Sequence, residues 1–151
     1  MTVDLPDEAS WLNLDKQVCF ALYSTSLAMN KLYRKVLKPF GLTYSQYLVL
    51  LTLWQQDDLS VSAIGEQLFL DSATLTPLLK RMESAGLVVR QRAAHDERHV
   101  IISQTDKAKQ LKAEAAVIPE QILCSTACDI DMLLEMKTHL ELLRTNILER
   151  L

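Results

Sequence analysis

The sequence predicts a mainly α-helical fold with a single two-stranded β-hairpin, and three observations support that prediction. Apolar residues recur at helical spacing over most of the 151 residues. Only 3 glycines and 4 prolines are present, which leaves little material for a turn-rich β fold. Two β-branched runs, "LVVRQR" and "HVIISQ", flank the polar segment "AAHDE" and indicate the hairpin. A chain of this length is one domain.

The first two helices are delimited by capping and helix-breaking residues. Apolar residues recur at helical spacing from Leu14 to about Val36, and Pro39 and Gly41 end that helix. Thr43 begins the next helix, because Gln46 three residues later completes a capping box. The second helix is short and almost wholly apolar, so we expect it to be buried.

Two short helices joined by a tight turn come next, which is the helix-turn-helix pattern. The first runs from a Ser60 cap to Leu68, and the second begins at a cap on Asp71 or Ser72 and ends before Gly86. Pro77 falls inside the second helix, where its missing N–H breaks a hydrogen bond, so we expect a kink or a later start. The hairpin follows directly as a wing.

Helical sequence resumes after the wing and continues to the end of the chain. Thr105 caps a long helical stretch that is interrupted near Pro119, and Asp129 or Asp131 begins a final amphipathic helix. The apolar side of this last helix comprises Leu133, Met136, Leu140, Leu143, Ile147 and Leu151.

Composition excludes several classes of protein. No apolar run approaches the roughly 20 residues of a membrane helix, so we expect no membrane partner. The acidic start "MTVDLPDEAS" lacks the layout of a signal peptide, which indicates a cytoplasmic protein. Three cysteines, at Cys19, Cys124 and Cys128, do not make a disulfide framework, because their number is odd and the first spacing is very long. We expect no cofactor and no metal.

Basic charge is concentrated where the two short helices and the wing lie. Residues 72–104 contain five basic and three acidic side chains, a net charge of +2; because the whole chain carries −3, the remainder carries −5. Such a local field suits phosphate neutralisation by a DNA-binding surface. The candidate DNA-binding residues are Ser72, Thr74, Thr76, Arg81, Arg90, Asp96 and Arg98.

These candidates have distinct expected roles. The hydroxyls near the start of the second short helix suit bases or phosphates, and Arg81 at its far end suits the DNA backbone. In the wing, the Asp96 carboxylate is placed to fix the Arg98 guanidinium for entry into the minor groove. Each residue taken singly is also consistent with an ordinary solvated charge or a capping hydroxyl.

The stretch "LSVSAIGEQLFLDSATLTPLLKRMESAGLVVRQRAAHDERHVIISQT" resembles the DNA-binding core of the MarR family of bacterial transcription regulators, including its D-x-R wing signature at Asp96 and Arg98. It departs from the family where Gln104-Thr105 and Lys107 stand in place of Leu-Thr and Gly. The resemblance implies a winged helix at about 43–104, with dimerisation helices at about 10–40 and 105–151. It also implies a homodimer on double-stranded operator DNA with inverted repeats.

Within that family the chain is similar to the organic hydroperoxide-sensing repressors, through "VCFALYS", "NKLYRKVLKPFGLTYSQYLVL" and "DSATLTPLLKRME". The resemblance implies a repressor, not an enzyme, in which Cys19 is the peroxide sensor and Tyr33 and Tyr44 bind its thiol. It also implies that Cys124 resolves oxidised Cys19 through an intersubunit disulfide that releases DNA. Cys128 is not part of the family pattern and is a bystander or a substitute resolving cysteine.

The positions of the tyrosines bear on this hypothesis. Tyr33 lies 14 residues after Cys19, which is about 21 Å along one helix, so the two side chains do not meet within one chain. Antiparallel first helices of a dimer can bring them together. Tyr23, one turn after Cys19, and Tyr44 complete a phenol-lined pocket. Phenol hydroxyls donate hydrogen bonds, and donors aimed at sulfur stabilise the reactive thiolate.

Alternative interpretations of the cysteines and of the function remain open. Cys19 on an apolar helix face is also typical of a small core residue. Cys124 and Cys128 share a helix face but lack the histidine or carboxylate partners of a metal site. A related regulator could respond to a small aromatic ligand, with Cys19 structural. A thiol peroxidase is disfavoured by the absence of a C-x-x-C motif and of a βαβ pattern.

Overall fold

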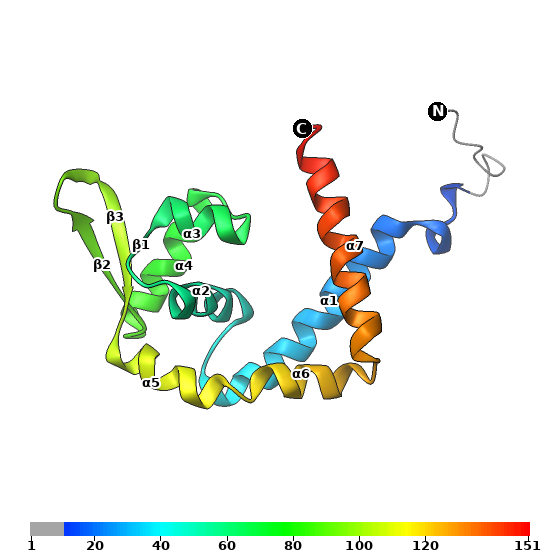
Figure 1. Cartoon of the computed structure of the whole chain (residues 1–151), viewed down its shortest axis with the longest axis horizontal. Helices are drawn as coiled ribbons and strands as arrows, with labels where there is room; N and C mark the ends of the chain where they lie inside the picture. Colours follow the sequence, from blue (N-terminus) through cyan, green and yellow to red (C-terminus); the bar gives the residue numbers. More distant parts are fainter. Residues whose placement is uncertain (1–10) are drawn as a thin grey trace.

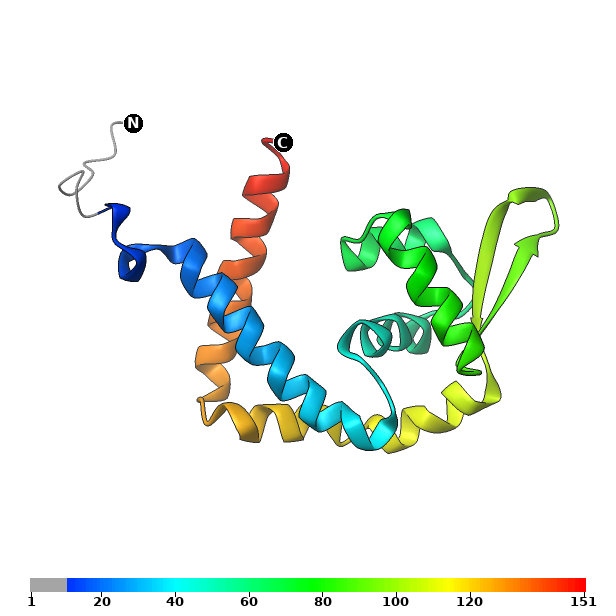
Figure 2. The same ribbon diagram turned by 180° about the vertical axis from the view of Figure 1, so that it is seen from behind.

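The computed structural model describes residues 11–151 and has the mainly helical fold that the sequence predicts (Figure 1). Figures 1 and 2 show one lobe of short helices and strands, which α5 and α6 connect to two long helices, α1 and α7. In chain order the elements are η2 (Leu14–Lys16), α1 (Val18–Leu37), η3 (Lys38–Phe40), α2 (Tyr44–Gln55), β1 (Leu59–Ser60), α3 (Val61–Leu68), α4 (Ser72–Ser84), β2 (Val88–Ala93), β3 (Asp96–Gln104), α5 (Asp106–Ala115), α6 (Ile118–Thr126) and α7 (Ile130–Leu148).

The first helix begins later than the apolar pattern predicts. Gln17 is extended, with φ −86° and ψ 113°, and it separates a short 3-10 turn at Leu14–Lys16 from α1. The expected end of the first helix and the expected start of the second are confirmed. Gly41 follows η3 with φ 65°, in the left-handed region that favours glycine. The capping box at the start of α2 is present, with Gln46 N donating to Thr43 Oγ1 at 3.3 Å and Thr43 N donating to Gln46 Oε1 at 3.0 Å.

The helix-turn-helix is confirmed, and Asp71 rather than Ser72 caps its second helix. Its carboxylate accepts a hydrogen bond of 2.7 Å from Thr74 N. The expected later start is wrong, since α4 runs unbroken from Ser72 to Ser84 with Pro77 inside it. The cap secures the first turn, and Leu75 and Leu79, buried on either side of Pro77, hold the helix against the core. These contacts outweigh the missing hydrogen bond.

The turn between α3 and α4 is tight. Phe69 has φ 56°, in the left-handed region, and Leu70 N donates to Gly65 O at 2.9 Å. A Cβ on Gly65 would lie 2.7 Å from Leu70 O, so only glycine fits the close approach of these two segments. The turn therefore fixes the start of α4 relative to α3.

The wing belongs to a three-stranded antiparallel sheet in the order β1-β3-β2, where we expected only a hairpin. The missed strand is two residues long, with Leu59 opposite Ile102, and so short a segment has no periodicity of its own. The polar segment between the long strands is also shorter than "AAHDE". Only residues 94–95 form the turn, which places Asp96 and Arg98 within β3.

The C-terminal half begins at the predicted Thr105 cap, whose Oγ1 accepts from Ala108 N at 3.3 Å. The predicted interruption is present between α5 and α6, and Pro119 occupies the first turn of α6. Asp129 is the cap of α7, accepting from Asp131 N at 2.8 Å. Leu151, expected on the apolar side of the last helix, lies beyond the end of α7 at Leu148.

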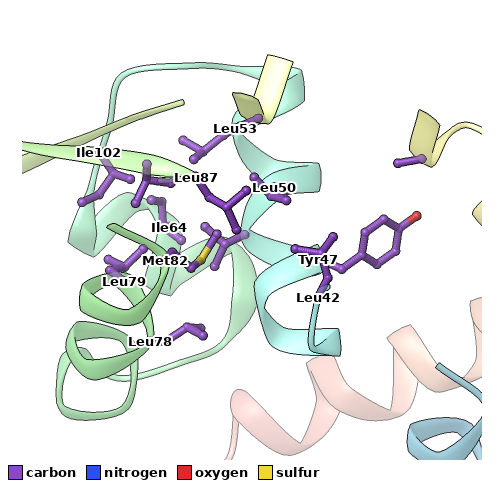
Figure 3. Close-up of a cluster of buried hydrophobic side chains, with 14 of the residues drawn as sticks. Leu42, Tyr47, Leu50, Leu53, Ile64, Leu78, Leu79, Met82, Leu87 and Ile102 are labelled. Carbon is purple, nitrogen blue, oxygen red and sulfur yellow. The ribbon is translucent and has the colours of Figure 1, made fainter. Parts of the chain in front are cut away.

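The core fills the space between α2, α3, α4 and the sheet (Figure 3). It does not stop at the expected limits of the winged helix. Trp54 Nε1 donates to Ala108 O at 3.0 Å and so joins α2 to α5. Buried side chains that lie before residue 43 or after residue 104 are Leu37, Leu42, Ala108, Ala115, Ile118 and Ile122.

The long helices α1 and α7 contribute little to this core. Leu37 is the only buried residue of α1, and no residue of α7 is buried. Large apolar side chains are exposed along both, including Val18, Leu22, Leu27, Ile130, Leu134, Leu140, Leu143 and Ile147. None of the helices within residues 11–151 has the length and hydropathy to span a membrane.

Candidate functional site

A hollow of about 480 Å³ separates the start of α3 and α4 from the wing. It brings together four of the predicted DNA-binding residues: Ser72 and Thr76 from α4, Arg90 from β2 and Arg98 from β3. Side chains far apart in the sequence therefore share one polar surface. Its remaining lining residues are Ser60, Val61, Ser62, His99 and Val100.

Arg90 is the most constrained cation of this surface. Its Nη1 lies 3.7 Å from Glu83 Oε2 of α4, so the guanidinium is tied to the end of that helix. Its Nε is buried and has no hydrogen-bond partner among residues 11–151. An unpaired buried donor costs free energy until an acceptor reaches it. A phosphate oxygen is an acceptor of the right chemistry.

The wing carboxylate acts differently from the expectation. Asp96 Oδ1 accepts a hydrogen bond of 3.0 Å from the backbone N–H of Arg98, and Asp96 Oδ2 lies 3.7 Å from Nε2 of His99. The structure therefore has Asp96 shaping the backbone at the start of β3 instead of clamping the Arg98 guanidinium. The Arg98 side chain is exposed.

The other predicted DNA-binding residues lie on α4 outside the lining of the hollow. Thr74 is exposed in the first turn and Arg81 in the last. Sequence reasoning missed Ser62 and His99 as members of the surface. Ser62 lies two residues after the Ser60 cap, so its sequence position indicates only the first turn of a helix. Apart from its place in the wing, no sequence pattern around His99 indicates a binding role.

The thiols are all free and exposed in this chain. Cys19 is the second residue of α1, so it is not a core residue of its own protomer. Cys124 lies near the end of α6. Cys128 lies between α6 and α7, where its Sγ donates to Thr126 O at 3.3 Å. Cys19 and Cys124 are thus accessible to chemistry or to a partner subunit.

Two predicted phenols are brought into contact. The rings of Tyr33 in α1 and Tyr44 in α2 stack with 4.1 Å between centroids, and Tyr47 lies 6.1 Å from Tyr33. Burial, and then the neighbouring phenols Tyr44 and Tyr47, raise the pKa of Tyr33 to about 12. Burial also raises the pKa of Tyr44, although a hydrogen bond with Tyr33 opposes that effect. Both hydroxyls therefore stay protonated at neutral pH and can donate hydrogen bonds.

The third predicted phenol is not part of this pair. Tyr23 is 62% exposed and lies one turn after Cys19, near the opposite end of α1. One protomer thus presents a thiol with Tyr23 near one end of α1, and stacked phenols near the other. Tyr47, which was not predicted, joins the phenol cluster from the second turn of α2.

Comparison with known proteins identifies the family. A family model described as transcriptional regulator SarA/Rot matches residues 31–115. The organic hydroperoxide resistance transcriptional regulator of Bacillus subtilis is 50% identical over 112 residues, which cover 74% of this chain and 76% of that protein. The chain belongs to the MarR/SarA-Rot family of winged-helix transcriptional regulators.

Solved structures of relatives have the same fold as this MarR-family chain. Reduced AbfR bound to DNA superposes with a TM-score of 0.79 at 39% identity, over 95% of this chain and 98% of that one. Disulfide-formed AbfR superposes with a TM-score of 0.63 at 41% identity, over 90% and 96%. AbfR is a protein of Staphylococcus epidermidis. Overoxidized AbfR bound to DNA superposes with a TM-score of 0.78, so the chain is more similar to both DNA-bound forms of AbfR than to the form with the disulfide.

Proposed function

We propose that the chain is a homodimeric transcriptional repressor that binds inverted-repeat operator DNA when reduced and leaves it when an organic hydroperoxide oxidises Cys19. The observation that carries the proposal is the stacked pair of protonated phenols, Tyr33 and Tyr44, at the end of α1 remote from Cys19. The Cys19 thiol and the phenol pair lie at opposite ends of α1, so they cannot act together within one chain. A two-fold dimer unites them, because antiparallel copies of α1 bring the thiol of one protomer to the phenols of the other.

The exposed apolar faces of α1 and α7 support the dimer. Burial of apolar area is the main driving force of association, and the described part of the chain leaves these faces uncovered. With two-fold symmetry, the two copies of α4 lie about one DNA turn apart or a small multiple of it. The hollow that contains Arg90 and Arg98 then contacts the backbone and grooves of each half-site.

The proposed chemistry begins with the Cys19 thiolate, which attacks the terminal oxygen of the hydroperoxide. The S–O bond forms as the O–O bond breaks, so sulfur loses two electrons and the hydroperoxide is reduced. The leaving alkoxide takes one proton from a phenol hydroxyl of Tyr33 or Tyr44 and departs as an alcohol, and the phenolate regains a proton from water, to which the Cys19 thiol gave up its own proton. The product is sulfenic acid at Cys19.

The second step is resolution by Cys124 of the partner subunit. Its thiol attacks the Cys19 sulfenic acid, forming an S–S bond and releasing water. The Cα atoms must come within about 7 Å for that bond. Because Cys19 lies on α1 and Cys124 on α6, closing the bridge displaces these helices relative to one another and changes the spacing of the winged lobes. The two AbfR forms, one reduced on DNA and one with a disulfide, support this scheme by analogy.

Cysteine variants test the proposal. We expect Cys19→Ser to bind operator DNA and to ignore cumene hydroperoxide. Cys124→Ser should form sulfenic acid at Cys19 but no covalent dimer on a non-reducing gel. Cys128→Ser is the matched control and should behave as wild type. Loss of the covalent dimer in Cys128→Ser, with its retention in Cys124→Ser, would reverse the assignment of the resolving cysteine.

Stoichiometry separates this regulator from a thiol peroxidase. A sensor without a recycling reductant consumes about one hydroperoxide per Cys19, whereas an enzyme turns over continuously when a thiol reductant is supplied. Sustained turnover with dithiothreitol at the rate of the first oxidation would contradict the proposal.

A further inference from the structure

The turn between α3 and α4 is held in an unusual backbone conformation. Phe69 has φ 56° and ψ 37°, in the left-handed region that bulky residues rarely adopt. Its side chain is 59% exposed, so the core of the DNA-binding lobe does not secure it. Backbone strain of this kind persists only where the surrounding structure holds it. The contacts of the Phe69 ring therefore bear directly on the position of the turn.

The ring of Phe69 is contacted by the last helix. The guanidinium of Arg144 lies over the ring, with Cζ 4.3 Å from the centroid, within the range of a cation–π interaction. Leu148, one turn later on α7, lines a hollow of about 520 Å³ together with Phe69 and Asp71. Side chains of α7 thus reach the helix-turn-helix at its turn.

This contact is remote from the other connections between the DNA-binding lobe and the long helices. Those connections run through α5 and α6 and through the stacked rings of Tyr33 and Tyr44. In both views α2 lies between α5 and the pair α3 and α4 (Figures 1 and 2). A lobe held along one edge alone can turn about that edge, as domains do about a hinge. A second attachment on the far side fixes its orientation.

The turn transmits its position to the start of α4. A Cβ on Gly65 would lie 2.7 Å from Leu70 O, so α3 and the turn are packed too closely to slide past one another. Asp71, two residues after Phe69, caps α4 by accepting a hydrogen bond of 2.7 Å from Thr74 N. A displacement of Phe69 therefore moves the first turn of α4, the end of a recognition helix that meets base edges.

We propose that Arg144 and Phe69 are positioning residues that fix the orientation of each winged lobe relative to α7, and so set the spacing of half-sites that the dimer accepts. The inference rests on the proposed dimer on inverted-repeat DNA and adds what holds its two recognition helices at one separation. With the contact formed, the two copies of α4 match one operator spacing. Without it, each lobe turns more freely about α5 and α6, and other spacings are bound at a smaller loss of affinity.

Operators of different spacing test the inference. An inverted-repeat duplex is selected from a random pool with the reduced wild-type protein, and a second duplex carries one extra base pair between its half-sites. That base pair moves the half-sites apart by about 3.4 Å and rotates one relative to the other by about 35°. Fluorescence anisotropy gives the ratio of the two affinities. We expect Arg144→Gln to lower the wild-type ratio about twofold to fivefold, the effect of one exposed cation–π contact.

Three further variants provide the controls. Phe69→Leu removes the ring and should lower the ratio as Arg144→Gln does. Arg144→Lys keeps a cation over the ring and should restore most of the ratio. Arg150→Gln removes the same charge from an exposed position beyond the end of α7, and it should keep the wild-type ratio. A duplex with a single half-site reports on one lobe alone, and every variant should bind it as the wild type does.

The outcomes separate the inference from the proposed function. An unchanged ratio in Arg144→Gln, or an equal reduction in Arg150→Gln, would overturn the inference and leave the proposed repressor intact. Weaker binding of the single half-site by Arg144→Gln would show damage within the lobe in place of a change in its orientation, which also overturns the inference. If the wild-type protein selected no inverted repeat, the proposed dimer on DNA would fail, and the inference with it.

Discussion

The guanidinium of Arg144 lies over the ring of Phe69, with Cζ 4.3 Å from the ring centroid. This cation–π contact joins α7 to the turn between the two helices of the helix-turn-helix. Leu148, one turn further along α7, lines a hollow together with Phe69 and Ser72. The last helix therefore touches the DNA-binding lobe at the point where α4 begins.

Removing that contact should lower the stability of the protein only slightly. We expect Arg144→Gln to lower the free energy of unfolding by about 0.5–1 kcal/mol, the size of an exposed cation–π contact, as measured by urea denaturation. Arg144→Lys keeps a cation and should cost less. Equal losses in the two variants would show that the ring does not bind the charge.

The phenol pair should control the rate of sensing. Tyr33→Phe and Tyr44→Phe each remove one hydrogen-bond donor and little volume, so we expect the fold to persist. Oxidation of Cys19 by cumene hydroperoxide should slow about tenfold, the loss of one hydrogen bond to a charged group. Tyr23→Phe serves as the comparison, because Tyr23 is exposed and lies outside the stacked pair. If Tyr23→Phe slowed oxidation as much as Tyr33→Phe, the stacked pair would have no special role.

Alkaline titration provides an independent test of the pair. The pKa of Tyr33 rises from 10.0 to about 12, with burial as the first cause, so the folded protein holds the neutral phenol more strongly than the unfolded chain does. The stabilisation is complete below pH 10 and is lost as the pH rises from 10 to about 12. We expect Tyr33→Phe to flatten the fall in the free energy of unfolding over that range. An unchanged slope would contradict the raised pKa.

The wing should contribute affinity without contributing to the fold. The Arg98 side chain is exposed, so Arg98→Ala should leave the melting temperature and the dimer unchanged. We expect operator affinity to fall by about 1–3 kcal/mol in a fluorescence anisotropy titration, with a smaller slope against salt concentration. Arg81→Ala, outside the hollow, is expected to weaken binding less. If Arg98→Ala bound the operator with wild-type affinity, Arg98 of the wing would not contribute to DNA binding.

Local chemistry explains which parts of the fold were predictable from the sequence. Ser60, Thr43 and Thr105 cap helices through their own hydroxyls, and Gly86 adopts φ 71° at the end of α4, so each carries its signal within a few residues. The strand β1 has no such local sequence pattern, because its two residues become a strand only by pairing with β3. Gln17, which delays the start of α1, is likewise ordinary in sequence.

The site was predictable only in part, because several of its contacts join segments that are distant in the sequence. The two β-branched runs located the wing, but the hydrogen bond of Asp96 to the backbone of Arg98 depends on the strand that follows. The pairing of Arg90 with Glu83 depends on how β2 packs on α4. Helical spacing showed that Cys19 and Tyr33 do not meet in one chain. The stacking of Tyr33 on Tyr44 required the turn through Gly41, which no local pattern specifies.

The absence of any buried residue in α7 has a consequence for the supply of the regulator in the cell. Helices in proteins owe most of their stability to tertiary packing, so in the proposed dimer the 19-residue α7 becomes firmly ordered when the chain meets a second copy. Unpaired chains expose the apolar stripes of α1 and α7 and become substrates for chaperones and proteases. If the chain acts as the proposed dimer, its active concentration therefore falls more steeply than its total concentration when little of it is made.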